Sequence, residues 1–112
     1  MAHRDLNVLD ASERAADRID ELIERPSGRR LLHVNQMRRA VNAISGNIGE
    51  AFGRGTEGDR IRVLRIARGE AEETIRYLNS NFRSKRVSPN DYWSIHNLLV
   101  VIVKMLTALV HR

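Results

Sequence analysis

The chain has 112 residues, enough for one domain (1–112) with its own core, and no cysteine, which excludes a disulfide framework and a thiolate metal site. Its formal net charge is +5, unevenly spread: residues 1–28 hold four Arg against seven Asp/Glu, and residues 29–112 hold fifteen Lys/Arg against seven Asp/Glu. This asymmetry favours a polyanionic partner, although 17 Arg against two Lys also fits a compositional bias on solvated helix faces.

The first predicted helix covers about residues 6–24. Its apolar residues recur at helical spacing and stop before an Arg-Pro-Ser-Gly stretch at 25–28. The start of the chain is charged throughout and does not resemble a signal peptide, so we expect a cytoplasmic protein.

The second predicted helix covers about residues 29–52 and contains three glycines. Its core stripe consists of Val34, Met37, Val41, Ile44, Ile48 and Phe52, and Gly46, Gly49 and Gly53 lie roughly opposite. Interior glycines cost about 0.5–1 kcal/mol each relative to alanine, so we expect a close approach to this backbone. A neighbouring subunit is the first candidate, and a phosphate backbone or another polypeptide is the second; tolerated drift or a frayed helix end is the alternative.

Two polar residues of this helix, Asn47 and Glu50, border the core stripe. They predict a buried or half-buried hydrogen-bonded pair that fixes the packing register, in preference to a ligand site.

The third predicted helix begins at a capping box formed by Thr56 and Asp59 and continues to about residue 83. Its apolar seam consists of Leu64, Ala67, Ala71, Ile75, Leu78 and Phe82. Positions 62, 69, 76 and 83 recur every seven residues on one side of the helix and are occupied by Arg62, Gly69, Arg76 and Arg83, with Arg65 alongside. We interpret them as a possible ridge for phosphates. Glu72 and Glu73 have salt-bridge spacing to this side, and the sequence shows no accompanying set of aromatic residues for base stacking.

The fourth predicted helix begins at Ser-Pro-Asn-Asp, residues 88–91, where Ser88 can cap the helix, and runs to the end of the chain. Its apolar residues cover about 200° of the circumference, whereas a bundle helix needs a stripe of about 100°. Part of this surface is therefore expected between protomers. The predicted oligomer interface consists of Gly46, Gly49, Gly53, Val100, Val101, Val103 and Val110. The apolar run at 98–110 is too short to span a bilayer, so no membrane partner is expected.

Short connections between four amphipathic helices predict an all-α, antiparallel up-and-down four-helix bundle. The four histidines form no H-E-x-x-H motif, and no nucleophile elbow or phosphate-binding loop is present. We therefore expect no enzyme activity, no metal and no cofactor.

Residues 35–78 resemble a family of small four-helix bundle proteins that occur in open reading frames of bacterial 23S rRNA intervening sequences, the S23 ribosomal protein-like family. The resemblance rests on three blocks: Gln36–Ala40; Asn47, Ile48 and Glu50 with Arg54; and Ile66–Gly69 with Glu72. The chain departs from the family pattern at Ala43, Ala51 and Glu70. The resemblance implies a ring, a homopentamer. It also implies a fold shared with the accessory variability determinant of diversity-generating retroelements, a basic ring that partners a reverse transcriptase and nucleic acid.

Two functions from different classes remain open. In the first, a non-catalytic basic oligomer binds RNA or DNA with little sequence preference. Its phosphate contacts would be Arg38, Arg39, Arg54, Arg62, Arg65, Arg76, Arg83, Lys85 and Arg86. In the second, the oligomer is a protein-interaction scaffold whose arginines are solvated or salt-bridged.

Overall fold

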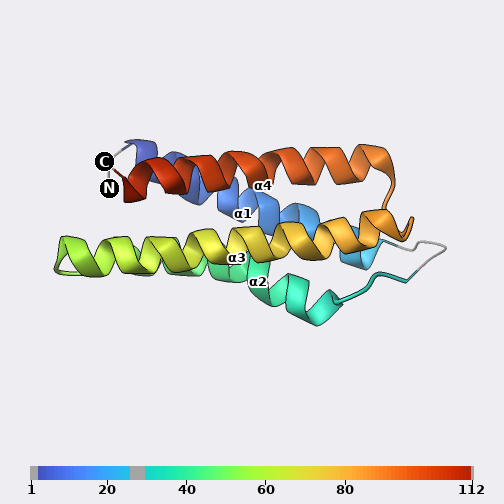
Figure 1. The fold of residues 1–112 in the computed structure, drawn as a ribbon, viewed down its shortest axis with the longest axis horizontal. Helices are drawn as coiled ribbons and strands as arrows, with labels where there is room; N and C mark the ends of the chain where they lie inside the picture. Colours follow the sequence, from blue (N-terminus) through green and yellow to red (C-terminus); the bar gives the residue numbers. More distant parts are fainter. Residues whose placement is uncertain (1–2, 26–29, 112) are drawn as a thin grey trace.

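The computed structural model describes residues 3–25 and 30–111, with side chains from Asn7 onward. Within these residues the chain forms four helices and no strand: α1 (His3–Glu24), α2 (Val34–Ala51), α3 (Glu57–Arg83) and α4 (Pro89–Val110). They run up and down along a rod of 48 × 21 × 19 Å, and both chain ends lie at the end that carries the α2–α3 connection (Figure 1). The predicted all-α, antiparallel four-helix bundle is confirmed.

Each helix packs against two neighbours. α3 lies against α2 and α4, and α1 lies against the same two helices, whereas no described Cα atoms of the diagonal pairs come within 8 Å of each other. The reason is visible in the spacing of the buried residues, which alternates between three and four positions and gives each helix one inward seam. In α3 these buried residues are Leu64, Ala67, Ala71, Thr74, Leu78 and Asn81, and in α4 they are Tyr92, Ile95, Leu99, Ile102, Leu106 and Leu109.

The predicted starts of α3 and α4 are also confirmed. The Thr56 hydroxyl accepts a hydrogen bond from the Asp59 N–H at 3.2 Å, and the Ser88 hydroxyl accepts one from the Asp91 N–H at 3.2 Å. Both caps bind an N–H group that has no partner inside the helix, and both helices carry acidic residues in their first turn.

α2 begins later than its periodicity predicted. The expected start, residue 29, lies outside the described residues, and the helix begins only at Val34. Asn81 explains the difference: its side-chain oxygen accepts from the Leu32 N–H at 2.7 Å, and its amide donates to the Leu32 carbonyl at 3.1 Å. Both peptide groups of Leu32 are therefore bound to α3. His33 then turns the chain through the left-handed region (φ 58°) into α2.

The predicted pair of Asn47 and Glu50 is wrong. The Asn47 amide donates to the Ala43 carbonyl one turn earlier at 2.8 Å, and the exposed Glu50 pairs with Arg54. Both side chains thus find partners on their own helix or just beyond its end, so neither fixes the register between helices.

The predicted oligomer interface is partly corrected. Val110 is 5% exposed and belongs to the core of its own protomer, Val100 and Val103 are half-buried, and Val101 is 44% exposed. A Cβ added at Gly46 or Gly49 would meet nothing within 4 Å, and one at Gly53 would meet only backbone of its own helix. No described residue of the protomer therefore approaches Gly46 or Gly49, and their contact with a second subunit stays a prediction.

The apolar run at 98–110 is part of a longer helix, so its own length does not decide whether the helix could cross a membrane. α4 has 22 residues and, by length and composition alone, could cross a bilayer. The core helix of a bundle meets the same criteria. In this fold Leu99, Ile102 and Leu106 are fully buried against the other helices, which accounts for the apolar character of one face.

Candidate functional site

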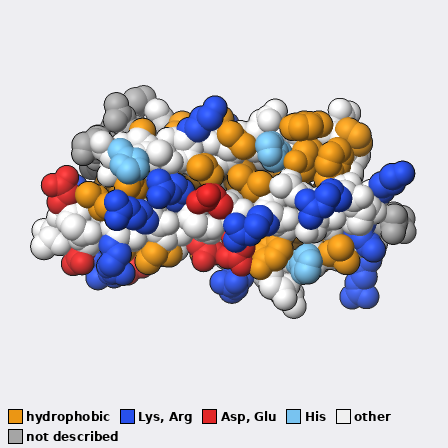
Figure 2. Space-filling model, viewed as in Figure 1, with side chains coloured by type: hydrophobic (Ala, Val, Ile, Leu, Met, Phe, Trp, Pro, Cys, Tyr) orange, Lys and Arg blue, Asp and Glu red, His pale blue; other side chains and the backbone are white. Residues whose placement is uncertain are grey.

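Four arginines project from the side of α3 that faces away from the core. This set, Arg62, Arg65, Arg76 and Arg83, is named the α3 ridge here, and all four side chains are exposed. A seven-residue repeat advances about 10 Å along a helix, so the ridge extends for about 30 Å. Figure 2 shows basic side chains along the length of this face, with acidic ones near its middle.

The members of the α3 ridge differ in their contacts. Arg62 Nε lies 3.9 Å from Asp59, and Arg83 donates to the Ser80 hydroxyl at 3.4 Å. Arg65 and Arg76 make no hydrogen bond or ion pair with any residue that the structure describes. Their guanidinium groups therefore keep all their donors and their charge for a partner.

The other predicted phosphate contacts are more dispersed. Arg38 lies 3.4 Å from Asp20 of α1, Arg39 lies 3.6 Å from Glu73 of α3, and Arg54 pairs with Glu50. Lys85 is exposed in the turn between α3 and α4. The structure thus brings the α3 ridge together but spreads these four cations over both ends and the α2 side of the rod.

Arg86 has a structural role that its sequence position did not reveal. Its guanidinium donates to the Arg30 carbonyl at 2.6 Å and to the Ser84 hydroxyl at 3.1 Å. It therefore helps Asn81 to hold the segment that enters α2, with two of its five N–H donors used inside the fold.

Acidic residues border the ridge on its α2 side. Glu73, expected to pair within α3, instead faces Arg39 and accepts a hydrogen bond from the Tyr77 hydroxyl at 2.6 Å, which raises the pKa of Tyr77. Burial, and then the neighbouring charge of Glu73, raise the pKa of Glu70. One carboxylate oxygen of Glu70 is buried without a hydrogen-bond partner. This border limits the basic surface to the outer and α4-facing sides of α3.

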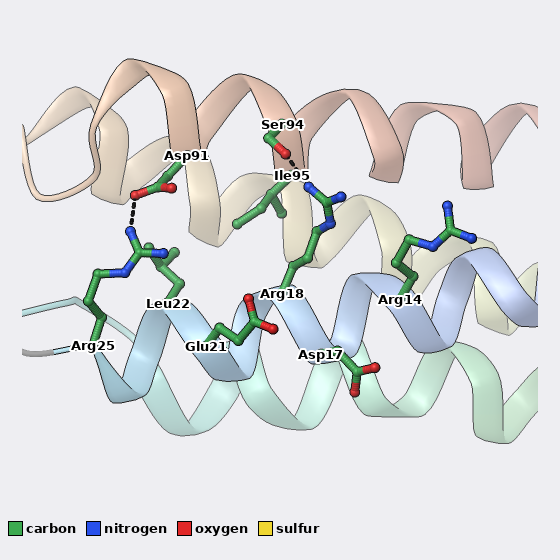
Figure 3. A pocket seen from close by; sticks show the side chains of 9 residues that line it. All are labelled: Arg14, Asp17, Arg18, Glu21, Leu22, Arg25, Asp91, Ser94 and Ile95. Carbon is green, nitrogen blue, oxygen red and sulfur yellow. Dashed lines mark hydrogen bonds and ion pairs between the residues drawn. The ribbon is translucent and has the colours of Figure 1, made fainter.

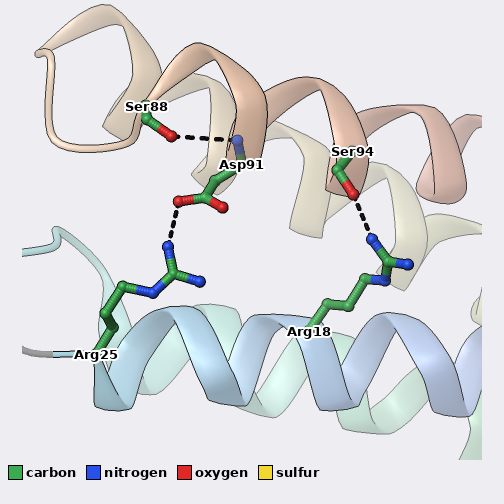
Figure 4. Close-up of polar contacts among 5 residues, drawn as sticks. All are labelled: Arg18, Arg25, Ser88, Asp91 and Ser94. Carbon is green, nitrogen blue, oxygen red and sulfur yellow. Dashed lines mark hydrogen bonds and ion pairs between the residues drawn. The ribbon is translucent and has the colours of Figure 1, made fainter.

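A second cluster of charge lies in a groove of about 310 Å³ between α1 and α4 (Figure 3). Arg18 of α1 and Arg25, just beyond the end of α1, reach toward α4, where Arg18 donates to Ser94 and Arg25 pairs with Asp91 (Figure 4). Arg14 pairs with Asp10 of its own helix at 2.9 Å. Asp17 and Glu21 also line the groove, so three basic side chains face three acidic ones. This α1/α4 groove is electrically balanced and suits a polyanion poorly.

The structure also assembles an aromatic cluster that the sequence analysis missed. Phe82 in the last turn of α3 stacks on Tyr92 in the first turn of α4, with ring centroids 3.9 Å apart and planes 7° apart. Tyr92 also stacks on His96, and Trp93 packs beside them with half of its surface exposed. The sequence could have predicted this cluster, because two antiparallel helices joined by a short turn place the end of the first helix beside the start of the second.

Among the described side chains, potential metal ligands form no cluster comparable to the aromatic one. In residues 7–25 and 30–111, no three His, Asp or Glu side chains come together as a metal site would require. The α3 ridge, with the aromatic cluster near one end of it, is therefore the candidate site that the described residues support best.

Comparisons with known proteins agree with the fold. Residues 4–108 match the family model described as 23S rRNA-intervening sequence protein. No curated protein matches the chain. Among solved structures, the chain is similar to the crystal structure of a protein with unknown function from the S23 ribosomal protein family of Bacteroides thetaiotaomicron VPI-5482. The two share 29% identity and a TM-score of 0.87 over 97% of this chain and 99% of that chain. The chain belongs to the 23S rRNA-intervening sequence protein family, as the resemblance of residues 35–78 predicted.

Proposed function

We propose that the protein is a non-catalytic basic bundle that binds RNA or DNA through the phosphate backbone, with the α3 ridge as its contact surface. The observation that carries this proposal is that Arg65 and Arg76 are exposed and have no partner among the described residues, whereas the arginines of the α1/α4 groove all have one.

Binding of this kind depends on charge and carries little sequence information. Each arginine that neutralises a phosphate releases condensed counterions, so the affinity falls as salt rises. No recognition helix or base-reading motif accompanies the ridge in the sequence, and phosphate contacts alone do not distinguish bases. We therefore expect strong salt dependence and weak discrimination between sequences.

Self-assembly is part of the proposal. The resemblance implies a homopentamer, and the open surface over Gly46 and Gly49 would let a second protomer approach α2 closely. A ring would present several copies of the α3 ridge to one nucleic acid, which raises the overall affinity without new contacts. Replacing Gly46 and Gly49 with leucine should weaken assembly more than helicity. If light scattering gave both variants the parent mass, close approach at these glycines would be rejected.

The function is tested by fluorescence anisotropy with labelled structured RNA and duplex DNA across a salt series. The ridge variant carries Arg62→Ala, Arg76→Ala and Arg83→Ala. Its control carries Arg14→Ala, Arg18→Ala and Arg25→Ala, which removes the same charge from the α1/α4 groove. The ridge variant should bind more weakly, with a logarithmic salt slope shallower by about 2–3.

The outcomes separate three cases. Equal losses in both variants would show that net charge alone drives binding and would reject the ridge as the site. Unchanged binding in the ridge variant would reject it as well. No binding by the folded parent at low salt would reject the function itself.

The alternative function is a protein-interaction scaffold, with a partner such as the reverse transcriptase that the resemblance implies. It is favoured by three large apolar side chains that are at least 44% exposed: Ile66, Trp93 and Val101. Single exposed apolar residues are common on protein surfaces, so these three carry less weight than the unpaired arginines. An assembled parent that binds no nucleic acid would favour the scaffold.

A further inference from the structure

Trp93 is the only tryptophan of the chain, and half of its surface is exposed on α4. An indole is large and apolar, and it gains most when it is covered. Its surroundings are aromatic: Phe82, Tyr92 and His96 lie within 6.4 Å of it, centroid to centroid. This concentration of rings is unusual in a chain of which only 4% is Phe, Trp or Tyr.

The four rings have a definite arrangement. Phe82, Tyr92 and His96 form a stack, with Tyr92 in the middle at 3.9 Å from Phe82 and 5.1 Å from His96. Trp93 stands at 70–79° to all three rings and is nearest to the middle one, at 4.9 Å. It therefore lies along the side of the stack in an edge-to-face contact, and the stack holds the indole in place from one side.

This aromatic cluster lies beside the α3 ridge. Phe82 directly precedes Arg83, and its ring contacts α4. About two turns further along the same pair of helices, Arg76 and Lys104 line one groove together with Ile75, Val100 and the acidic Glu72, so the groove carries one net positive charge. Figure 2 shows hydrophobic side chains gathered next to the basic ones at this end of the rod. A chain that follows the ridge over Arg76 and Arg83 thus passes an exposed indole.

Cations that follow a backbone, with an aromatic ring beside them, form the arrangement that binds single-stranded nucleic acid. A base inside a duplex is already stacked on both faces and cannot reach a side chain at the protein surface, whereas an unpaired base can. We infer that the protein prefers nucleic acid with unpaired bases, and that one such base stacks on Trp93 while neighbouring phosphates bind Arg76 and Arg83. This inference rests on the proposed function and names the form of nucleic acid that the ridge takes.

The test uses the intrinsic fluorescence of the full-length protein, which reports on Trp93 alone because no other tryptophan is present. Oligouridylate and oligothymidylate, each long enough to follow about 30 Å of ridge, are compared with a duplex of the same length. The single strands should quench the fluorescence and bind more tightly than the duplex. Trp93→Ala has no tryptophan, so its binding is followed by the anisotropy of a labelled strand. It should weaken single-strand binding about 5- to 150-fold, the range of one base–aromatic stack, and leave duplex binding unchanged.

Two further variants test whether a loss of binding comes from the missing aromatic ring or from any truncation of an exposed apolar side chain. Trp93→Phe keeps an aromatic face and should retain most of the single-strand affinity. Ile66→Ala truncates another exposed apolar side chain of the bundle (44% exposed), on α3, and should change neither form of binding. Equal single-strand losses in Trp93→Ala and Ile66→Ala would overturn the stacking role of Trp93.

Failure of the inference is distinguishable from failure of the proposed function. Salt-dependent binding of single strands and duplex with equal affinity, unquenched fluorescence and no effect of Trp93→Ala would overturn the inference and leave the ridge intact. Absence of binding to any probe at low salt would reject both. A change of oligomeric mass in Trp93→Ala, with unchanged binding per protomer, would assign the indole to a contact between copies of the chain and overturn the inference.

Discussion

The α1/α4 groove and the α3 ridge contain the same residue type in opposite situations. In the groove, Arg18 and Arg25 reach a hydroxyl and a carboxylate on the facing helix. On the ridge, Arg65 and Arg76 have neither among the described residues. The difference lies in position on the helix: residues that flank the buried seam reach polar groups of a neighbouring helix, whereas residues opposite the seam point mainly into solvent. Arginine beside a seam therefore supports packing, and arginine opposite it is available to a partner.

The largest effect is expected at Asn81, where a polar side chain is completely buried and its partners cannot turn to water. Asn81→Ala removes the acceptor and the donor that hold Leu32, and it leaves the peptide groups of Leu32 without partners. The free energy of unfolding should fall by about 2 kcal/mol, measured by urea denaturation. Asn97→Ala, an exposed position on α4, is the control and should change it little. Equal effects of the two variants would mean that Asn81 does not anchor the entry to α2.

The second prediction compares the two sets of arginines directly. Arg18→Ala with Arg25→Ala removes both side-chain contacts from α1 to α4 that the groove shows, and should lower the free energy of unfolding by about 1 kcal/mol, since such exposed pairs contribute little each. Arg65→Ala with Arg76→Ala removes the same charge but no contact between described residues, and should leave stability within about 0.5 kcal/mol of the parent. A ridge variant as unstable as the groove variant would show that the ridge supports the fold.

The sequence predicted one side of this contrast, the ridge, and not the groove. Periodicity placed Arg62, Arg76 and Arg83 on one side of a helix, because that property depends only on the helical repeat. It could not show that Arg86 binds the Arg30 carbonyl 56 residues away, or that Glu73 faces Arg39, because those contacts depend on how helices are placed. The late start of α2 was hidden for the same reason: tertiary hydrogen bonds to Asn81 override the local preference for helix.

The acidic border on the α2 side of the ridge can be tested through the pH dependence of the free energy of unfolding. The pKa of Glu70 is raised above its ordinary value of 4.5 by burial and by Glu73, so the folded protein holds this proton more tightly than the unfolded chain does. Stability attributable to Glu70 is therefore lost as pH rises from 4.5 through the folded pKa. Glu70→Gln should stabilise the protein at pH 7, by less than the groove variant destabilises it, and the gain should vanish below pH 4.5. Glu72→Gln, at an exposed neighbouring position, is the matched control for removing one carboxylate. A gain for Glu70→Gln that persisted unchanged in acid would assign the effect to packing.

The smallest effect is expected at Lys85, the cation in the turn beside the aromatic cluster. Its φ of 60° lies in the left-handed region, and its N–H and that of Arg86 close the end of α3 on the carbonyls of Phe82 and Asn81. Glycine usually occupies this position because a side chain is strained there. Lys85→Gly should therefore raise the free energy of unfolding by about 0.5 kcal/mol, since the greater freedom of glycine in the unfolded chain offsets part of the relief. Lys85→Ala removes the same charge but keeps the strain, so a gain in both variants would trace the effect to charge, whereas a gain in Lys85→Gly alone would trace it to the backbone.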